Sequence, residues 1–139
     1  MFRTVVVGAD DSPTAAVAVE AAIDLVEQSQ GTLHVVSAYT PVSPLPSNVP
    51  SEFRDTVHSD SVVRSLLDNL TARARLRGVA VEAHDRRGAP ADAVKEVADQ
   101  VAADLVVVGS KGMNRRVLSS IPNSIAHQAS CAVLIVKTD

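Results

Sequence analysis

The chain has 139 residues, 46% of them hydrophobic, and carries 13 Lys and Arg against 16 Asp and Glu, a formal net charge of −3 at pH 7. This length and composition are typical of one globular domain, residues 1–139, with a single core. The negative balance and an aromatic content of 2% without Trp argue against nucleic acid as a partner, because basic and stacking surfaces are both missing.

No apolar run approaches the ~20 residues of a membrane span, so we expect no membrane partner. The single cysteine, Cys131, cannot form an intrachain disulfide or complete a Cys-rich zinc site. We expect it to be a small buried hydrophobic residue, and we expect a cytoplasmic protein.

Val-rich runs alternate with longer segments of helical periodicity, which is typical of βαβ units around a parallel sheet. The expected strands are Thr4–Gly8, Thr32–Tyr39, Val79–Asp85, Asp104–Gly109 and Cys131–Lys137. The first and fourth are apolar without alternation, as in strands that helices cover on both faces. We therefore expect these two strands to be the central pair.

Four helices are expected between the strands. The first begins after Asp11-Ser12, which can cap it, and ends before Gly31. The other three are expected from about Ser59 to Arg77, from Pro90 onward, and from about Ile121 to Ala129. The inward stripe of the first helix would comprise Ala15, Ala18, Val19, Ala22, Leu25 and Val26. Four of the seven prolines lie within Pro41–Pro50, which predicts a long surface loop.

Both central strands run into loops with ligand-binding character, and ligands of parallel sheets bind beyond the carboxyl ends of strands where the winding direction reverses. Asp10 follows the first strand and could accept a hydrogen bond from a sugar hydroxyl. Gly109 and Gly112 follow the fourth strand and would let the backbone approach a phosphate, although a Gly-x-x-Gly turn can be purely conformational. Lys111 and Arg115 could add positive charge there, or lie on a solvated face.

Sequence motifs of catalytic sites are missing: there is no Gly-x-Ser-x-Gly, His-Glu-x-x-His, P-loop or Gly-x-Gly-x-x-Gly. The four histidines, which we interpret as packing or surface residues, are His34, His58, His84 and His127. We expect no catalytic residues, no metal site and at most weak ATP hydrolysis, with an enzyme of a related nucleotide-binding α/β class as a third hypothesis.

Four segments in this order resemble the universal stress protein family. They are Val5–Ser12, Gly88–Pro90, Ala103–Gly112 and Ile121–Val136. The resemblance implies an α/β three-layer sandwich of the adenine nucleotide alpha hydrolase-like kind, with a five-stranded parallel sheet in the order 3-2-1-4-5 and helices on both faces. It also implies a homodimer joined through the C-terminal strand, and an adenine nucleotide in the cleft between the loops after strands 1 and 4.

The resemblance assigns a role to particular residues. Asp10, next to Ala9, would face the ribose and adenine, the backbone at Ala38 would meet the adenine edge, and Val108 would pack against the base. The phosphate end would comprise Gly109, Lys111, Gly112, Arg115, Ser119, Ser120 and the Ile121 amide.

The phosphate loop departs from the family motif Gly-x2-Gly-x9-Gly-Ser/Thr. Only Met113–Leu118 separate Gly112 from Ser119, which occupies the position of the last glycine. We expect ATP first, with Mg²⁺ only together with ATP. Because a shorter loop encloses less of a polyphosphate, AMP and cyclic AMP stay open beside it. We expect a stress-response regulatory module that binds one of these nucleotides. The alternative is a nucleotide-free dimeric interaction protein of the same fold.

Overall fold

The computed structural model describes residues 2–10, 13–39, 60–110 and 121–137. Five parallel strands form one sheet in the order β3-β2-β1-β4-β5. The strands are β1 (Thr4–Gly8), β2 (Thr32–Tyr39), β3 (Ala80–Arg87), β4 (Leu105–Gly109) and β5 (Ala132–Val136), and the helices are α1 (Pro13–Ser29), α3 (Asp60–Leu76), α4 (Pro90–Gln100) and α5 (Ile121–Gln128). The α/β fold, the strand order and the central position of β1 and β4 are confirmed.

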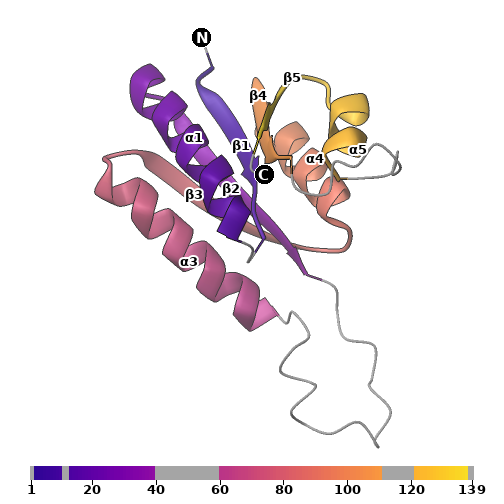
Figure 1. Cartoon of the computed structure of the whole chain (residues 1–139), viewed down its shortest axis with the longest axis horizontal. Coiled ribbons are helices and arrows are strands. Elements are labelled where there is room, and N and C mark those ends of the chain that lie inside the picture. Colours follow the sequence, from indigo (N-terminus) through magenta and orange to yellow (C-terminus); the bar gives the residue numbers. More distant parts are fainter. Residues whose placement is uncertain (1, 11–12, 40–59, 111–120, 138–139) are drawn as a thin grey trace, which may run out of the picture.

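Helices cover both faces of the sheet (Figure 1), and this explains the unbroken apolar runs of β1 and β4. Successive side chains of a strand point to opposite faces. Val5 and Val7 accordingly belong to the apolar cluster under α1 and α3, whereas Val6 belongs to the cluster under α4 and α5. All three valines are 0% exposed, so neither face of β1 tolerates a polar residue.

The start of β1 is held by close backbone contacts from two sides. Thr32 N donates to Arg3 O at 2.7 Å, and the carboxylate of Asp104 accepts from Arg3 N at 3.0 Å and from Thr4 N at 3.1 Å. Gly31 lies so close that a Cβ on it would be 2.0 Å from Arg3 O. Glycine is therefore required at position 31 by the close approach of two backbone segments.

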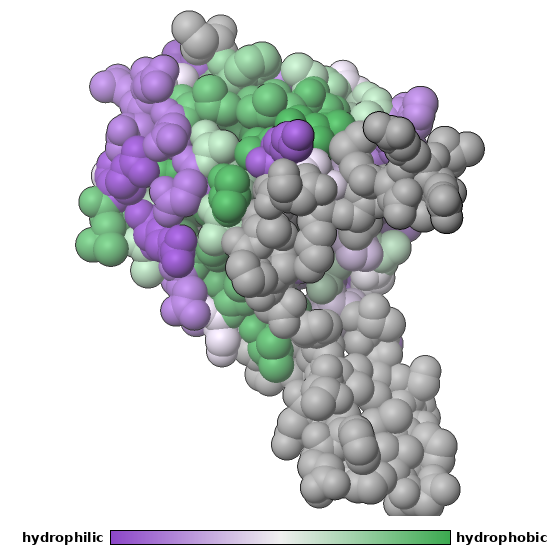
Figure 2. All heavy atoms as spheres, in the orientation of Figure 1, coloured by the Kyte–Doolittle hydropathy of each residue, from purple (hydrophilic) through white to green (hydrophobic). Residues whose placement is uncertain are grey.

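Exposed charges join the two helices on the α1 and α3 face. Arg77, just after α3, contacts Asp24 at 2.6 Å and Glu27 at 2.9 Å on α1, and Arg73 contacts Glu20 at 3.4 Å. Figure 2 shows hydrophilic side chains gathered over this side of the molecule. Exposed ion pairs each contribute little to stability. The attachment of α1 and α3 to the sheet therefore comes mainly from the apolar cluster beneath them, and the ion pairs connect the two helices to each other.

The buried face of α1 is broader than its predicted stripe. Ile23, outside that stripe, is fully buried, while Leu25, inside it, is only partly buried. Ile23 belongs to the apolar cluster that joins α1 to the sheet and to α3. Cys131 is another correction: it precedes β5 and is partly rather than fully buried, and this burial raises the pKa of its thiol.

Several expectations fall outside the described residues. These include the capping roles of Asp11 and Ser12 and the loop Pro41–Pro50. None of the described helices combines the length and the apolar character needed to span a membrane.

We expect Gly31→Ala to destabilise the protein by about 2 kcal/mol or more, because the new methyl group would overlap the Arg3 carbonyl and both partners are backbone. Urea denaturation followed by circular dichroism measures the change. Gln128→Ala, at an exposed position, is the control and should stay within about 0.5 kcal/mol of the parent protein. A Gly31→Ala variant as stable as this control would refute the close approach.

Candidate functional site

The backbone splits at the carboxyl ends of the two central strands. Pairing between β1 and β4 ends at Val7 and Val107. Beyond this point Ala9 N donates to Val36 O of β2 at 2.9 Å, whereas Ser110 N donates to Val136 O of β5 at 2.8 Å. The two backbone segments that follow β1 and β4 therefore turn away from each other. This split, bounded by Gly8–Asp10 and Val108–Ser110, is the switch point at which open parallel sheets bind ligands.

Small and apolar residues lie beside the split on the α4 face of the sheet. A Cβ on Gly8 would lie 3.0 Å from Val94 Cγ2 and 3.8 Å from Val108 Cγ1, so the strand backbone itself packs against these valines. Val108 is buried, and Ala38 on β2 is partly buried against the same apolar cluster. On this face the backbone of β1 is thus covered by apolar side chains, and the residues that border the split are small or apolar.

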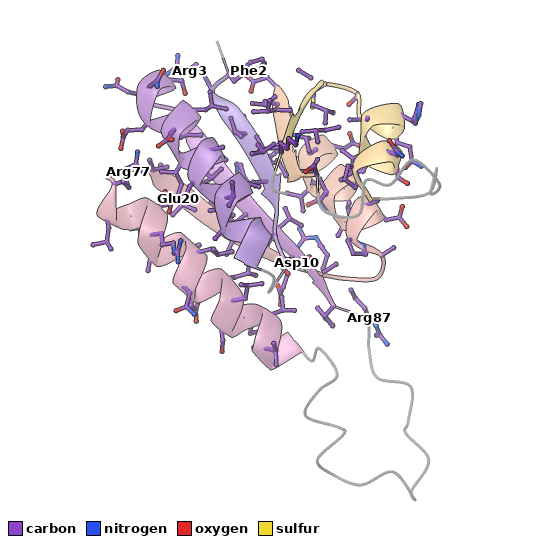
Figure 3. The ribbon with its side chains drawn as sticks, in the orientation of Figure 1. Phe2, Arg3, Asp10, Glu20, Arg77 and Arg87 are labelled. Carbon is purple, nitrogen blue, oxygen red and sulfur yellow. The ribbon has the colours of Figure 1, made fainter. Side chains whose placement is uncertain are left out.

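Polar groups stand at the mouth of the split. Asp10 is exposed after the end of β1, and Ser110 is buried directly after β4. Figure 3 shows Asp10 at the same end of the sheet as Arg87, an exposed cation at the end of β3. Sequence reasoning did not single out Arg87, because only the parallel pairing of β2 and β3 brings it to this edge.

The structure brings together part of the predicted site. Ala9, Asp10, Val108 and Gly109 flank the split, and Ala38 lies on the adjacent β2. Ile121 is the first residue of α5. The remaining predicted site residues lie outside the described part of the chain and stay predictions: Lys111, Gly112, Arg115, Ser119 and Ser120.

Another group of polar side chains lies on β2 and β3. Within the described residues, His34, Glu82 and His84 form a group whose ligand atoms could hold a metal ion. Burial lowers the pKa of both histidines, which favours their neutral forms. The sequence analysis interprets His34 and His84 as packing or surface residues, and the structure adds that their ring nitrogens lie 2.9 Å apart.

Comparison with known proteins assigns the family. The sequence pattern described as "Universal stress protein family" matches residues 1–137. The chain belongs to the universal stress protein family. Universal stress protein Rv1636 of Mycobacterium tuberculosis is 32% identical, over 99% of this chain and 97% of that protein.

Solved structures agree with this assignment. A universal stress protein crystallised in complex with cAMP superposes with a TM-score of 0.82 at 32% identity, covering 99% of this chain and 98% of that one. An Arabidopsis thaliana universal stress protein with AMP bound gives a TM-score of 0.73 at 21% identity, covering 99% and 92%, a likeness that concerns the fold alone. The predicted family resemblance is confirmed.

Proposed function

We propose that this universal stress protein binds an adenine nucleotide at the split between β1 and β4 and serves as a regulatory module in the stress response. The observation that carries the proposal is the divergence of the β1 and β4 segments after Val7 and Val107. It leaves backbone and short side chains at the carboxyl ends of the central strands. The relative crystallised with cAMP, at 32% identity over nearly the whole chain, supports the ligand class.

In this proposal each side of the split recognises a different part of the nucleotide. The Asp10 carboxylate accepts hydrogen bonds from ribose hydroxyls, the backbone at Ala38 meets the adenine edge, and Val108 packs against the base. The phosphate lies toward Gly109 and the Ile121 amide at the start of α5, where helix N–H groups favour an anion. Lys111, Gly112, Arg115, Ser119 and Ser120 complete the phosphate end in the proposal.

The short phosphate loop favours a monophosphate. Pro122 has no N–H, so the first turn of α5 offers one donor fewer to a phosphate. We therefore propose AMP or cyclic AMP ahead of ATP, with Mg²⁺ only if ATP binds. Turnover would be weak at most, because no nucleophile and base pattern accompanies Asp10 in the sequence.

We expect Asp10→Asn to weaken AMP binding by about 10- to 100-fold, the cost of losing a charge-assisted hydrogen bond. Isothermal titration with protein stripped of endogenous nucleotide measures the affinity. Asp68→Asn, an exposed carboxylate on α3, is the matched control and should bind like the parent protein.

Titration with 2′-deoxy-AMP sharpens this test, because that ligand lacks one of the hydroxyl donors. It should bind the parent protein more weakly than AMP and should lose less on Asp10→Asn. Equal losses for both ligands would reject the ribose contact, and no heat with AMP, cyclic AMP or ATP would reject the proposed function.

The edge strand β5 favours a second candidate function, a dimeric interaction module working in the cytoplasm. Leu134 lies on the sheet face that α1 and α3 cover, yet it is 38% exposed because β5 lies at the margin of that face. An apolar edge strand is a template for pairing with another chain. We propose that two copies pair through β5, with or without nucleotide.

We expect Leu134→Lys to shift the protein from dimer to monomer in sedimentation velocity at micromolar concentration, because a charge would be buried between the two copies. Leu76→Lys is the control, since Leu76 is 88% exposed on α3, which packs against β2 and β3 on the side of the sheet opposite β5. A parent protein that sediments as a monomer would contradict the dimer.

A further inference from the structure

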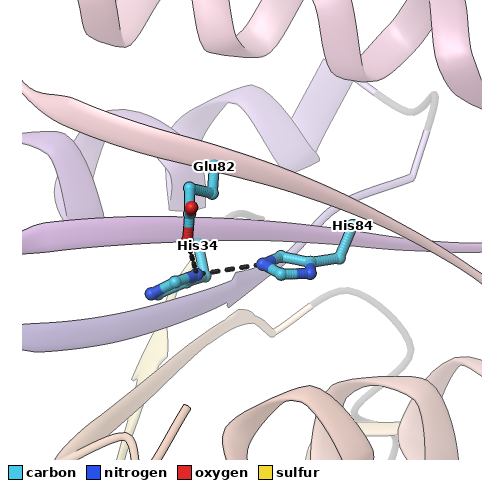
Figure 4. A group of neighbouring side chains, drawn as sticks. All are labelled: His34, Glu82 and His84. Atoms are coloured by element: carbon cyan, nitrogen blue, oxygen red, sulfur yellow. Dashed lines mark hydrogen bonds and ion pairs between the residues drawn. The ribbon is translucent and has the colours of Figure 1, made fainter. Parts of the chain in front are cut away.

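A group of three potential ligands lies on the α4 face of β2 and β3, separate from the split. His34 and Glu82 are opposite each other in the parallel register, and His84 follows Glu82 by two residues, so all three side chains point to one face. Figure 4 shows them converging. His34 Nδ1 lies 2.9 Å from His84 Nε2 and 3.3 Å from a carboxylate oxygen of Glu82.

The protons available do not match the lone pairs that converge here. The two facing ring nitrogens lie 2.9 Å apart, which leaves room for only one hydrogen between them. If His34 Nδ1 carries it, His84 and Glu82 compete for one donor. If His84 Nε2 carries it, the Glu82 carboxylate faces a lone pair of His34. A cation at the centre would satisfy all three atoms at once.

The spacing fits such a cation. The three ligand atoms lie within 4.8 Å of one another. Tetrahedral zinc with bonds of 2.0–2.1 Å places its ligand atoms about 3.3 Å apart. The contact between the two histidines must open by a few tenths of an ångström. Glu82 can adjust its distance to His84 because its side chain is 66% exposed.

We propose that His34 Nδ1, His84 Nε2 and the Glu82 carboxylate bind one divalent transition-metal ion, with Zn²⁺ as the reference. Two imidazoles and one carboxylate are a ligand set that zinc uses with its fourth position open. His34, 5% exposed, would be the fixed ligand, and the exposed Glu82 marks the side from which the ion and a water molecule reach the site.

A metal ion binds the lone pair of a neutral imidazole nitrogen, so the hydrogen between the two rings must leave. The histidine that carries the shared hydrogen exchanges it, through solvent, for one on its other ring nitrogen, and both facing lone pairs then point at the metal. Arg86 is the nearby cation that opposes binding. It pairs with the Glu96 carboxylate at 3.3 Å, which offsets part of its charge, and it donates a hydrogen bond to Gln100 at 2.9 Å.

Titration of the untagged, chelator-treated full chain with ZnCl₂ in a calorimeter tests the proposal. We expect one ion per chain, and at least a tenfold weaker affinity for both Glu82→Gln and His84→Gln. His127→Gln removes an exposed histidine on α5 and is the matched control, expected to bind like the parent protein. Glu82→Gln keeps the shape of an exposed side chain, so the variant should retain the parent melting temperature without metal.

Cobalt(II) provides a readout that a merely structural group would not give. Loading the parent protein should produce the intense visible absorption of a tetrahedral site, and Glu82→Gln should reduce or shift it. The proposal is overturned if the parent protein takes up no zinc. It is equally overturned if Glu82→Gln and His84→Gln bind zinc as the parent does, which would leave a hydrogen-bonded group without a metal.

Discussion

The structure depends on the parallel pairing of β1 with β4 and on the point at which it stops. As far as Val7 and Val107 the two strands are neighbours, buried on both faces between two pairs of helices. Beyond that point the backbone after β1 hydrogen-bonds to β2, and the backbone after β4 hydrogen-bonds to β5. These hydrogen bonds to the outer strands separate the carboxyl ends of β1 and β4. The position of the candidate nucleotide site therefore follows from the strand order.

The two halves of β2 lie at the two proposed sites. Its carboxyl half carries Ala38 beside the split, and its amino half carries His34 in the group with Glu82 and His84. Both proposed sites include residues of β2, and α4 contacts this strand. The proposed metal would also tie the edge strand β3 to β2 by bonds stronger than hydrogen bonds, so it would stiffen the sheet on the side away from β5.

Sequence patterns predicted the elements well where burial is complete. The unbroken valine runs of β1 and β4 indicate coverage on both faces, and the strand order came with the family resemblance rather than from periodicity. The contact between His34 and His84 was beyond reach, because it joins positions 50 residues apart through a register that periodicity does not encode. The burial of Ile23 was missed for a similar reason, since it depends on the elements that pack around α1 and not on α1 alone.

The candidate site was predictable in part. Asp10 and Gly109 could be placed at adjoining strand ends from the order of strands and loops, and the structure places them there. The close approach of Gly31 to the Arg3 backbone was not predictable. A glycine after a helix indicates the end of that helix whether or not another backbone segment lies against it.

The most direct test of the central claim is a titration of ¹⁵N-labelled protein with cyclic AMP, followed by the backbone amide resonances. The account predicts that the largest shifts fall on Ala9 and Asp10 after β1 and on Gly109 and Ser110 after β4, with residues near His34 unchanged. Saturating nucleotide that leaves these four amides unmoved, or that shifts mainly residues elsewhere on the sheet, would contradict it.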